Sequence, residues 1–219
     1  MNNVELRGEI VATCRKLNAL GLNQGTSGNI GVRTGAQYLL TPSGMDYDLM
    51  APEDIVEMDF EGGYLGNRIP STEWRFHRDI LKNRPEVDVV IHTHSMFCTT
   101  LAIHGRSIPA VHYLVAAAGG PDIRCAPYVT PTTQALSDVA LEALEGRRAC
   151  LLAHHGAIVI GETLSSTLAL LVEVENLAEQ YWRALQIGEP PVLSEAQMAE
   201  IYELNKTYGR QPDPELRKQ

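Results

Sequence analysis

An apolar segment that ends in two histidines constrains the fold most strongly. Residues 87–91 are apolar apart from one aspartate, and His92-Thr93-His94 follows without a break. This density of branched apolar residues predicts a short buried strand. Because successive side chains of a strand point to opposite faces, we expect His92 and His94 on one face, a few ångströms apart. Two imidazoles in that arrangement are well placed to share a divalent cation, with satisfied structural histidines as the alternative.

A second histidine pair lies far along the chain. Residues 149–160 contain two apolar runs separated by His154-His155-Gly156, which predicts two strands joined by a tight turn. A histidine from this turn would complete a three-histidine site. Catalytic zinc centres use three protein ligands and keep a fourth position open. Either histidine of the pair is a candidate at this stage.

The remaining hydrophobic pattern alternates short strands with amphipathic helices. Apolar residues recur at helical spacing over residues 3–20, and Gly21 is a natural stop. Further strands are expected over 29–33, 37–41, 55–59 and 123–129. Further helices are expected from 71, and over 95–104, 112–120, 132–144, 163–186 and 194–206. No repeat or linker divides the chain, so we expect one domain over residues 1–219, with a flexible tail from about residue 209.

Two loops are rich in glycine, hydroxyl groups and amides. Residues 23–31 contain the skeleton Gly25-x-x-Gly28-x-x-Gly31, and residues 41–44 read Thr-Pro-Ser-Gly. The first loop lacks the Lys-Ser/Thr of a Walker loop and follows a helix, which argues against a dinucleotide fingerprint. The functional interpretation is a phosphate cradle made of backbone amides and small polar side chains. An ordinary helix-to-strand turn is the alternative.

The helix expected after Pro70 adds a carboxylate and an anion-binding end. Ser71 is predicted as its N-cap, which places Thr72 and Glu73 in the first turn. Free amides at a helix N-terminus favour an anion. Glu73 alone is also explained as a first-turn carboxylate that complements the helix dipole. For His77, one turn further on, packing or hydrogen bonding is favoured over metal ligation.

Composition excludes several functional classes. The formal net charge is −9, and no Lys/Arg-rich block occurs, which argues against a nucleic-acid-binding surface. The chain shows neither a signal peptide nor a run of about 18 apolar residues, so no membrane association is expected. Its four cysteines are scattered without a Cys-x-x-Cys pair, which predicts reduced, mostly buried thiols and a cytoplasmic protein.

Taken in order and spacing, these motifs resemble the class II aldolase/adducin family over nearly the whole chain. The motifs are Gly25-Thr-Ser-Gly-Asn29, Thr41-Pro-Ser-Gly44, Ser71-Thr-Glu-Trp-Arg-Phe-His77, His92-Thr-His94, His112-Tyr113 and His154-His-Gly156. Residues 116–120 and 125–128 are most similar to the L-fuculose-1-phosphate aldolase branch. The resemblance implies an α/β/α three-layer sandwich, with a mostly antiparallel central sheet covered by helices on both faces.

The resemblance also implies roles for individual residues. The metal, with zinc favoured over cobalt or manganese, would be held by His92, His94 and His155. Glu73 would ligate it without substrate and act as the acid/base when substrate displaces it. Tyr113 would reach the active site of a neighbouring subunit in a homotetramer. The expected phosphate-binding residues are Gly28, Asn29, Ser43, Gly44, Ser71 and Thr72.

The implied reaction is reversible retro-aldol cleavage of a ketose 1-phosphate to dihydroxyacetone phosphate and an aldehyde. Cleavage between C3 and C4 leaves negative charge on the dihydroxyacetone phosphate half, which a Lewis acid stabilises without a Schiff-base lysine. Glu73 would then exchange a proton with C3, and a tyrosine hydroxyl would exchange one with the C4 oxygen.

The chain departs from the fuculose branch on the side that faces the aldehyde. That branch carries aromatic residues where Pro131 and Asn205 stand here, whereas Tyr208 is retained. The substrate could therefore be L-fuculose 1-phosphate or a 5-deoxy- or 5-methylthio-pentulose 1-phosphate. A methylthioribulose-1-phosphate dehydratase, a pentulose-phosphate 4-epimerase and a non-catalytic adducin-like binding module are the alternatives.

Overall fold

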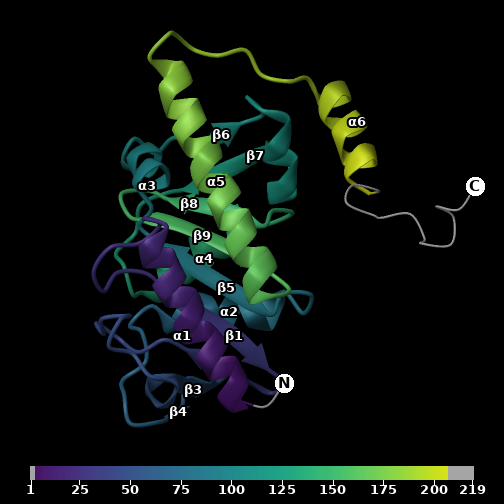
Figure 1. Ribbon diagram of the computed structural model, residues 1–219. Helices are drawn as coiled ribbons and strands as arrows, with labels where there is room; N and C mark the ends of the chain where they lie inside the picture. Colours follow the sequence, from purple (N-terminus) through teal and green to yellow (C-terminus); the bar gives the residue numbers. More distant parts are fainter. Residues whose placement is uncertain (1–2, 207–219) are drawn as a thin grey trace, which may run out of the picture.

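A single mixed sheet organises the part of the chain that the computed structural model describes, residues 3–206. Its strand order is β4-β3-β2-β1-β5-β9-β8-β7-β6, which Figure 1 shows from bottom to top. The pairs are antiparallel except for β7 with β8. The strands are β1 (Asn29–Thr34), β2 (Gln37–Leu40), β3 (Val56–Asp59), β4 (Tyr64–Leu65), β5 (Val89–Thr93), β6 (Ile108–Pro109), β7 (Asp122–Ala126), β8 (Ala149–Leu152) and β9 (Gly156–Gly161).

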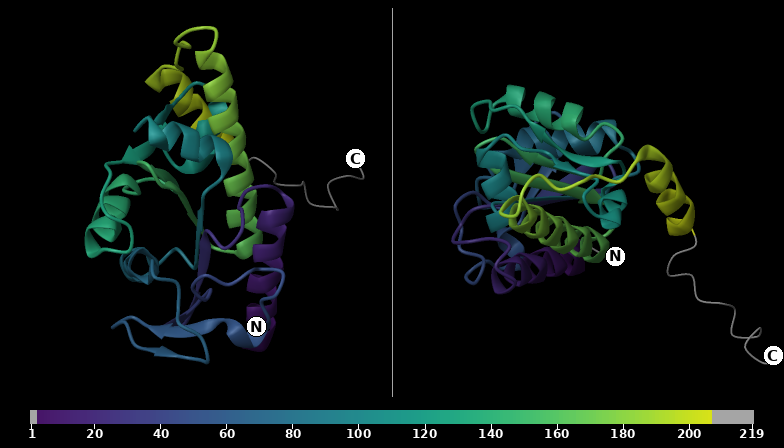
Figure 2. Two further views of the ribbon diagram at one scale, coloured as in Figure 1. Left: turned by 90° about the vertical axis from the view of Figure 1, so that its left-hand side faces the viewer. Right: turned by 90° about the horizontal axis from the view of Figure 1, so that it is seen from above.

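Helices cover both faces of this sheet and form the outer layers seen in Figure 2. On one face α1, α3 and α5 pack over residues such as Val89 and Ile91. On the other, α2 and α4 pack over residues such as Val90. The helices are α1 (Asn3–Ala19), α2 (Trp74–Asn83), α3 (Met96–Ile103), α4 (Gln134–Ala143), α5 (Leu164–Leu185) and α6 (Glu195–Asn205), with 3-10 turns η1 (Pro52–Asp54) and η2 (Tyr113–Ala118). The predicted three-layer α/β fold is confirmed.

Local capping chemistry explains several helix starts. The Thr163 hydroxyl accepts a hydrogen bond from the Ser166 amide at the start of α5. Ser194 accepts from the Gln197 amide in the same way at the start of α6. Each bond satisfies one of the amides that a helix N-terminus leaves free. Helix α6 packs mainly through Met198, which lies against Ala110 and Ala116.

One predicted helix start is wrong. Helix α2 begins at Trp74 with Glu73 as its N-cap, so Ser71 is not the cap. The Ser71 Oγ accepts a 3.3 Å hydrogen bond from the Glu73 amide in the turn that precedes the helix, and the Ser71 amide donates to the Thr41 carbonyl oxygen at 3.0 Å beside the 41–44 loop. Thr72 and Glu73 form a turn between this contact and the helix. This long-range pairing joins two of the predicted phosphate-binding segments.

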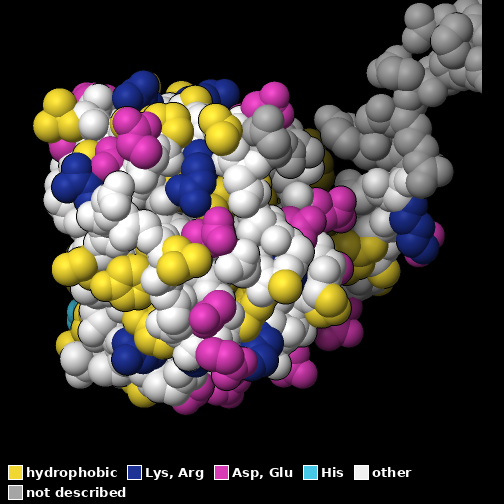
Figure 3. Space-filling model, turned by 90° about the horizontal axis from the view of Figure 1, so that it is seen from below, with side chains coloured by type: hydrophobic (Ala, Val, Ile, Leu, Met, Phe, Trp, Pro, Cys, Tyr) yellow, Lys and Arg dark blue, Asp and Glu magenta, His cyan; other side chains and the backbone are white. Residues whose placement is uncertain are grey.

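The mixed surface charge (Figure 3) and the unpaired thiols are those expected from the composition. On the face seen in Figure 3, basic and acidic side chains are interspersed among apolar ones. All four cysteines are unpaired, and three of them are buried. None of the helices between residues 3 and 206 is long and apolar enough to span a membrane. The predicted flexible tail from about residue 209 and the candidate Tyr208 lie outside the described residues.

Candidate metal centre and cavity

The site is built on the end of β5, between β1 and β9. Val90 and His92 point toward the α2 side of the sheet, and His92 contacts Phe76 edge-on at 5.6 Å between ring centroids. His94 follows the strand on the same side, and its Nε2 lies 3.1 Å from Nε2 of His92. His92 and His94 therefore lie on the same face with adjacent imidazole nitrogens, as strand alternation predicts.

The β8–β9 turn supplies the third histidine and resolves the choice between the pair. His154 adopts a positive φ of 55° and is exposed, with its ring edge-on to Tyr128. His155 instead turns inward, with its ring centroid 4.7 Å from that of His92 and 5.0 Å from that of His94. One ligand atom from each of His92, His94 and His155 lies within 4.8 Å of the others, a spacing that can hold a metal ion.

Glu73 closes the cluster from the start of α2. Its Oε2 lies 3.4 Å from His92 Nε2, and its Oε1 lies 3.2 Å from His155 Nε2. The same Oε2 accepts a hydrogen bond of 2.9 Å from Nδ2 of Asn29. Glu73 is only 9% exposed, and neighbouring side chains contact both of its carboxylate oxygens.

These distances match the edges of a small coordination shell. Two nitrogens that are each about 2.0–2.1 Å from a tetrahedral zinc ion lie roughly 3.3 Å apart. The observed separations between neighbouring ligand atoms are 3.1, 3.2 and 3.4 Å. His92 Nδ1 lies 2.9 Å from the Ala157 carbonyl oxygen and therefore donates to it, which leaves Nε2 with a free lone pair. The donor set therefore fits a divalent cation.

Burial sets the protonation states of the cluster. Burial lowers the pKa of His92 to about 4, and it also lowers the pKa of His94. For Glu73, burial alone raises the pKa, but the neighbouring His92 and His155 outweigh it, and the pKa falls well below its usual range. At neutral pH the site therefore presents unprotonated His92 and His94 imidazoles and an ionised Glu73 carboxylate, the forms that bind metals.

The cluster opens into a cavity of about 390 Å³. His94, His155 and Glu73 line one part of it, and the glycine- and hydroxyl-rich loops line the rest. All of the expected phosphate-binding residues lie on this wall, namely Gly28, Asn29, Ser43, Gly44, Ser71 and Thr72. Among residues 3–206 the lining includes neither lysine nor arginine, so an anion there would meet hydroxyl groups and amides.

Two close backbone approaches shape this wall. Gly28 has a φ of +76°, and a side chain there would lie 2.7 Å from the His92 carbonyl oxygen. Glycine is therefore required where the first loop meets the metal-binding strand. The Ser43 amide donates to the Ile69 carbonyl oxygen at 3.0 Å, which holds the 41–44 loop next to Thr72.

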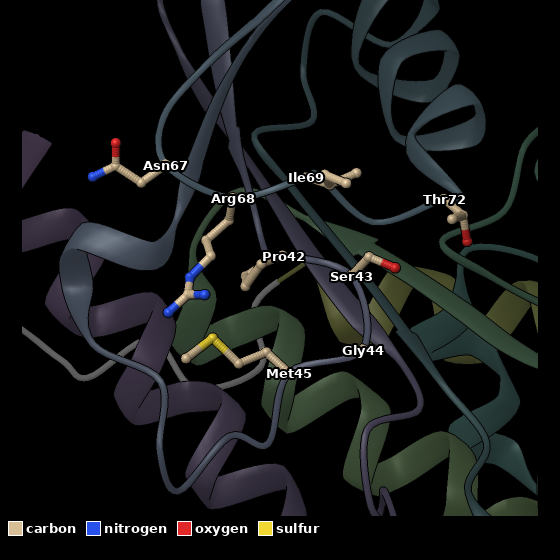
Figure 4. Close-up of a pocket in the computed structure, with 8 residues that line it drawn as sticks. All are labelled: Pro42, Ser43, Gly44, Met45, Asn67, Arg68, Ile69 and Thr72. Atoms are coloured by element: carbon tan, nitrogen blue, oxygen red, sulfur yellow. The ribbon is translucent and has the colours of Figure 1, made fainter.

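A second, wider cavity of about 600 Å³ adjoins the first and shares Pro42, Ser43, Gly44 and Thr72 with it. In Figure 4 the Ser43 and Thr72 side chains lie on one side, and the Arg68 guanidinium points away from them toward Met45. Arg68 is the charged residue of this lining, and its Nε donates to Asp54 at 2.8 Å. The wider cavity forms an open approach to the hydroxyl-rich wall.

The aldehyde-side candidates are divided by the structure. Pro131 lines the 390 Å³ cavity. Tyr113 is 48% exposed at the start of η2, and Asn205 is exposed at the end of α6. Neither of them lines that cavity. Within the described part of one chain, these two residues therefore do not contribute to the wall of this cavity.

Sequence reasoning assigned no role to four residues that line the cavity: Thr26, Ser27, Pro42 and Thr132. The first two belong to the hydroxyl-rich loop, so their composition was an available signal. Thr132 has a φ of +69°, a strained conformation for a β-branched residue that no sequence pattern announces. Its carbonyl oxygen accepts a 2.8 Å hydrogen bond from Arg75 at the start of α2, which helps to hold this wall.

Comparison with known proteins gives a consistent result. The family model described as "Class II Aldolase and Adducin N-terminal domain" matches residues 8–182. The chain is 53% identical over 208 residues to a 5-methylthioribulose-1-phosphate/5-deoxyribulose-1-phosphate aldolase of Rhodospirillum rubrum, with 95% of this chain and 94% of that protein covered.

Two further relatives carry another aldolase name. An L-fuculose phosphate aldolase of Escherichia coli is 44% identical over 210 residues, which cover 95% of this chain and 98% of that protein. A solved structure of an L-fuculose 1-phosphate aldolase superposes with a TM-score of 0.89 at 37% identity, covering 92% of this chain and 96% of that one. The similarity therefore extends over the fold and the site together.

Proposed function

The chain belongs to the class II aldolase and adducin family, and we propose that it is a metal-dependent aldolase acting on a ketose 1-phosphate. The products would be dihydroxyacetone phosphate and an aldehyde. One observation carries the proposal: His92, His94, His155 and Glu73 meet at one end of a cavity whose other wall carries neutral anion-binding groups. This arrangement suits a substrate with an oxygen-rich reacting end and a phosphate.

We assign His92, His94, His155 and Glu73 as the residues that would hold the cation, with zinc as the favoured ion. The imidazole-rich donor set and the small ligand separations support zinc, and cobalt or manganese would fit the same ligand types. When bound, the cation supplies a Lewis acid for the negative charge that develops on the substrate oxygens during cleavage.

Glu73 is the proposed acid/base. Its low pKa keeps it ionised at neutral pH, so in the condensation direction it can accept the proton from C3 of dihydroxyacetone phosphate. In cleavage the same carboxyl group returns a proton to C3. The Asn29 amide, 2.9 Å from Oε2, keeps the carboxylate directed toward the cavity.

The hydroxyl-rich wall is the proposed phosphate site. Ser43, Ser71 and Thr72 offer hydroxyl groups, and Gly28 and Gly44 let the backbone approach a ligand closely. Binding the phosphate there would place the carbon chain toward His94 and His155 at the other end of the cavity. The grip supplies positioning, which lowers the entropic part of the barrier.

For the substrate we favour a 5-deoxy- or 5-methylthio-pentulose 1-phosphate over L-fuculose 1-phosphate. The identity of 53% to the R. rubrum protein named for the former compounds supports this, against 44% to the E. coli enzyme named for the latter. Pro131, where the fuculose branch is expected to have an aromatic residue, lines the cavity and suits a different aldehyde half.

The test compares L-fuculose 1-phosphate, 5-deoxyribulose 1-phosphate and 5-methylthioribulose 1-phosphate with the zinc-loaded protein. Dihydroxyacetone phosphate is measured through its reduction by NADH in a coupled assay. We expect release from at least one compound, and faster release from the pentulose phosphates. No release from any of them would reject the aldolase proposal, and a dehydrated or epimerised product would identify one of the alternative reactions.

A variant series tests the acid/base. Replacing Glu73 with Gln keeps the size of the side chain but removes the base, so turnover should fall by about 10²–10⁴-fold. Glu162→Gln is the matched control, because Glu162 is an exposed carboxylate just before α5. Full turnover in the Glu73→Gln protein would show that another group moves the proton.

We also propose a cytoplasmic homotetramer in which Tyr113 acts in the active site of a neighbouring subunit. The unpaired cysteines support a reducing compartment, and Tyr113, which is half-exposed and does not line the cavity of its own chain, supports action on a neighbour. Mixing Glu73→Gln and Tyr113→Phe subunits should restore activity that neither variant has alone. Sedimentation of a fully active monomer would contradict this assembly.

A further inference from the structure

His77 is a fully buried histidine that lies next to the proposed site but does not line its cavity. It sits on α2, one turn after Glu73. Its Nε2 is 2.5 Å from Oδ1 of Asn29, and Nδ2 of Asn29 is 2.9 Å from Oε2 of Glu73. The three side chains therefore form a continuous hydrogen-bonded row that ends on the proposed acid/base.

The chemistry of the groups fixes the direction of this row. An ionised carboxylate only accepts hydrogen bonds, so Asn29 must present its NH2 group to Glu73. The Asn29 carbonyl oxygen then faces His77, which must donate from Nε2. His77 is therefore the tautomer with a proton on Nε2 and none on Nδ1.

The surroundings of His77 suit this one tautomer. Burial lowers the pKa of His77 to about 3, so the ring stays neutral. Its Nδ1 is buried without a hydrogen-bond partner among the described residues. A side chain at Gly31 would lie 2.5 Å from this Nδ1, so the glycine leaves room for the ring. An unsatisfied buried nitrogen destabilises the folded protein, and a purely structural position could avoid this with an apolar residue.

We propose that His77 is a positioning residue that fixes the orientation of the Asn29 amide toward Glu73. If the amide were reversed, its oxygen would face the Glu73 carboxylate at hydrogen-bond distance and repel it. Asn29 is also held through its backbone, since it pairs with His92 between β1 and β5. The inference rests on the proposed function, because the importance of the amide depends on Glu73 being the acid/base.

The first test reads the tautomer directly and needs no enzymatic activity. Protein labelled with ¹⁵N-histidine is studied by two-bond ¹H–¹⁵N correlation, and the His77 signals are assigned by their loss in a His77→Gln sample. We expect the Nε2–H form in the metal-free and the zinc-loaded protein. The Nδ1–H form would overturn the proposal, because Nε2 could then only accept from a reversed amide.

The second test separates positioning from packing. His77→Phe keeps a ring in the buried position but removes the donor, and turnover should fall by about 10–100-fold, the range typical of lost outer-shell contacts. His77→Gln restores an N–H at a similar distance and should recover most of the lost turnover. His104→Gln, at the exposed end of α3, is the control without effect.

The outcomes distinguish the two proposals. A folded His77→Phe protein with wild-type turnover would overturn the positioning role, and so would a folded Gln variant no better than Phe. If the wild-type protein cleaves none of the ketose phosphates, the aldolase proposal fails, whereas the tautomer experiment still decides how the Asn29 amide is held.

Discussion

Gly156 offers a sharp test of how β9 supports the candidate metal centre. This glycine follows His155, and the next residue, Ala157, pairs with Thr93 at the end of β5. A methyl group built on Gly156 would overlap the Thr93 carbonyl oxygen and lie 2.9 Å from Cδ2 of His94. The substitution Gly156→Ala therefore forces a backbone group and a ligand ring to move, without removing any ligand.

The size of the effect follows from these contacts. Carbon atoms in contact normally lie about 3.5–4.0 Å apart, so the His94 ring has to retreat by roughly 0.6–1.1 Å. Metal–ligand distances tolerate only about 0.2 Å. The Thr93 carbonyl oxygen belongs to the backbone of the paired strands β5 and β9, so it cannot easily move either. We expect a loss of about 1–3 kcal/mol in the free energy of unfolding of the metal-free protein. Zinc affinity should fall by about 10–100-fold.

Two measurements check this prediction. Urea denaturation in the presence of a chelator gives the unfolding free energy, and titration against a competing chelator gives the zinc dissociation constant. Gly8→Ala is the control, because nothing lies within 4 Å of a Cβ at that position in α1. It should raise the stability by about 0.5–1 kcal/mol and leave zinc affinity unchanged. If Gly156→Ala matched the wild type in both measurements, the proposed steric support of His94 would be wrong.

Three further predictions follow from the contacts. Glu175→Gln should lower the unfolding free energy by about 1–3 kcal/mol, because the Glu175 carboxylate accepts from Ser95 Oγ and from two α3 amides. Glu179→Gln is the control, because Glu179 pairs with the exposed Arg183, and it should change the unfolding free energy by less than about 0.5 kcal/mol in the same denaturation assay. The metal-free protein should lose stability as the pH falls from 6.5 toward 4. In the unfolded chain the His77 imidazole takes up a proton in this range, whereas in the folded protein its pKa of about 3 keeps it neutral. Urea titrations at several pH values should therefore show a smaller loss of stability for His77→Gln than for the wild type. Thr132→Gly should keep the unfolding free energy within about 1 kcal/mol of the wild type, because removing the strain of the positive φ offsets the added entropy of the unfolded chain. A larger loss in urea denaturation would show that packing of the Thr132 side chain outweighs the strain of its backbone.

Much of the fold was predictable because its signals are local. The β5 segment is apolar on both faces, and Thr163 and Ser194 cap their helices with their own hydroxyl groups. Strand alternation alone placed His92 and His94 on one face, and their nitrogens lie 3.1 Å apart. Periodicity and capping act over a few residues, so the sequence carries them without reference to the rest of the molecule.

By itself, then, the sequence determined the strand that carries His92 and His94, the helix caps, and the set of residue types able to bind a metal and a phosphate. Tertiary structure alone decided how distant residues meet. The turn at φ 55° selects His155 over His154, and pairing with Thr41 holds Ser71 beside the 41–44 loop. The same packing aligns His77 with Asn29 and Glu73, although His77 and Asn29 are 48 positions apart in the sequence. Such contacts depend on where the sheet brings separate segments together, and no local pattern encodes that geometry.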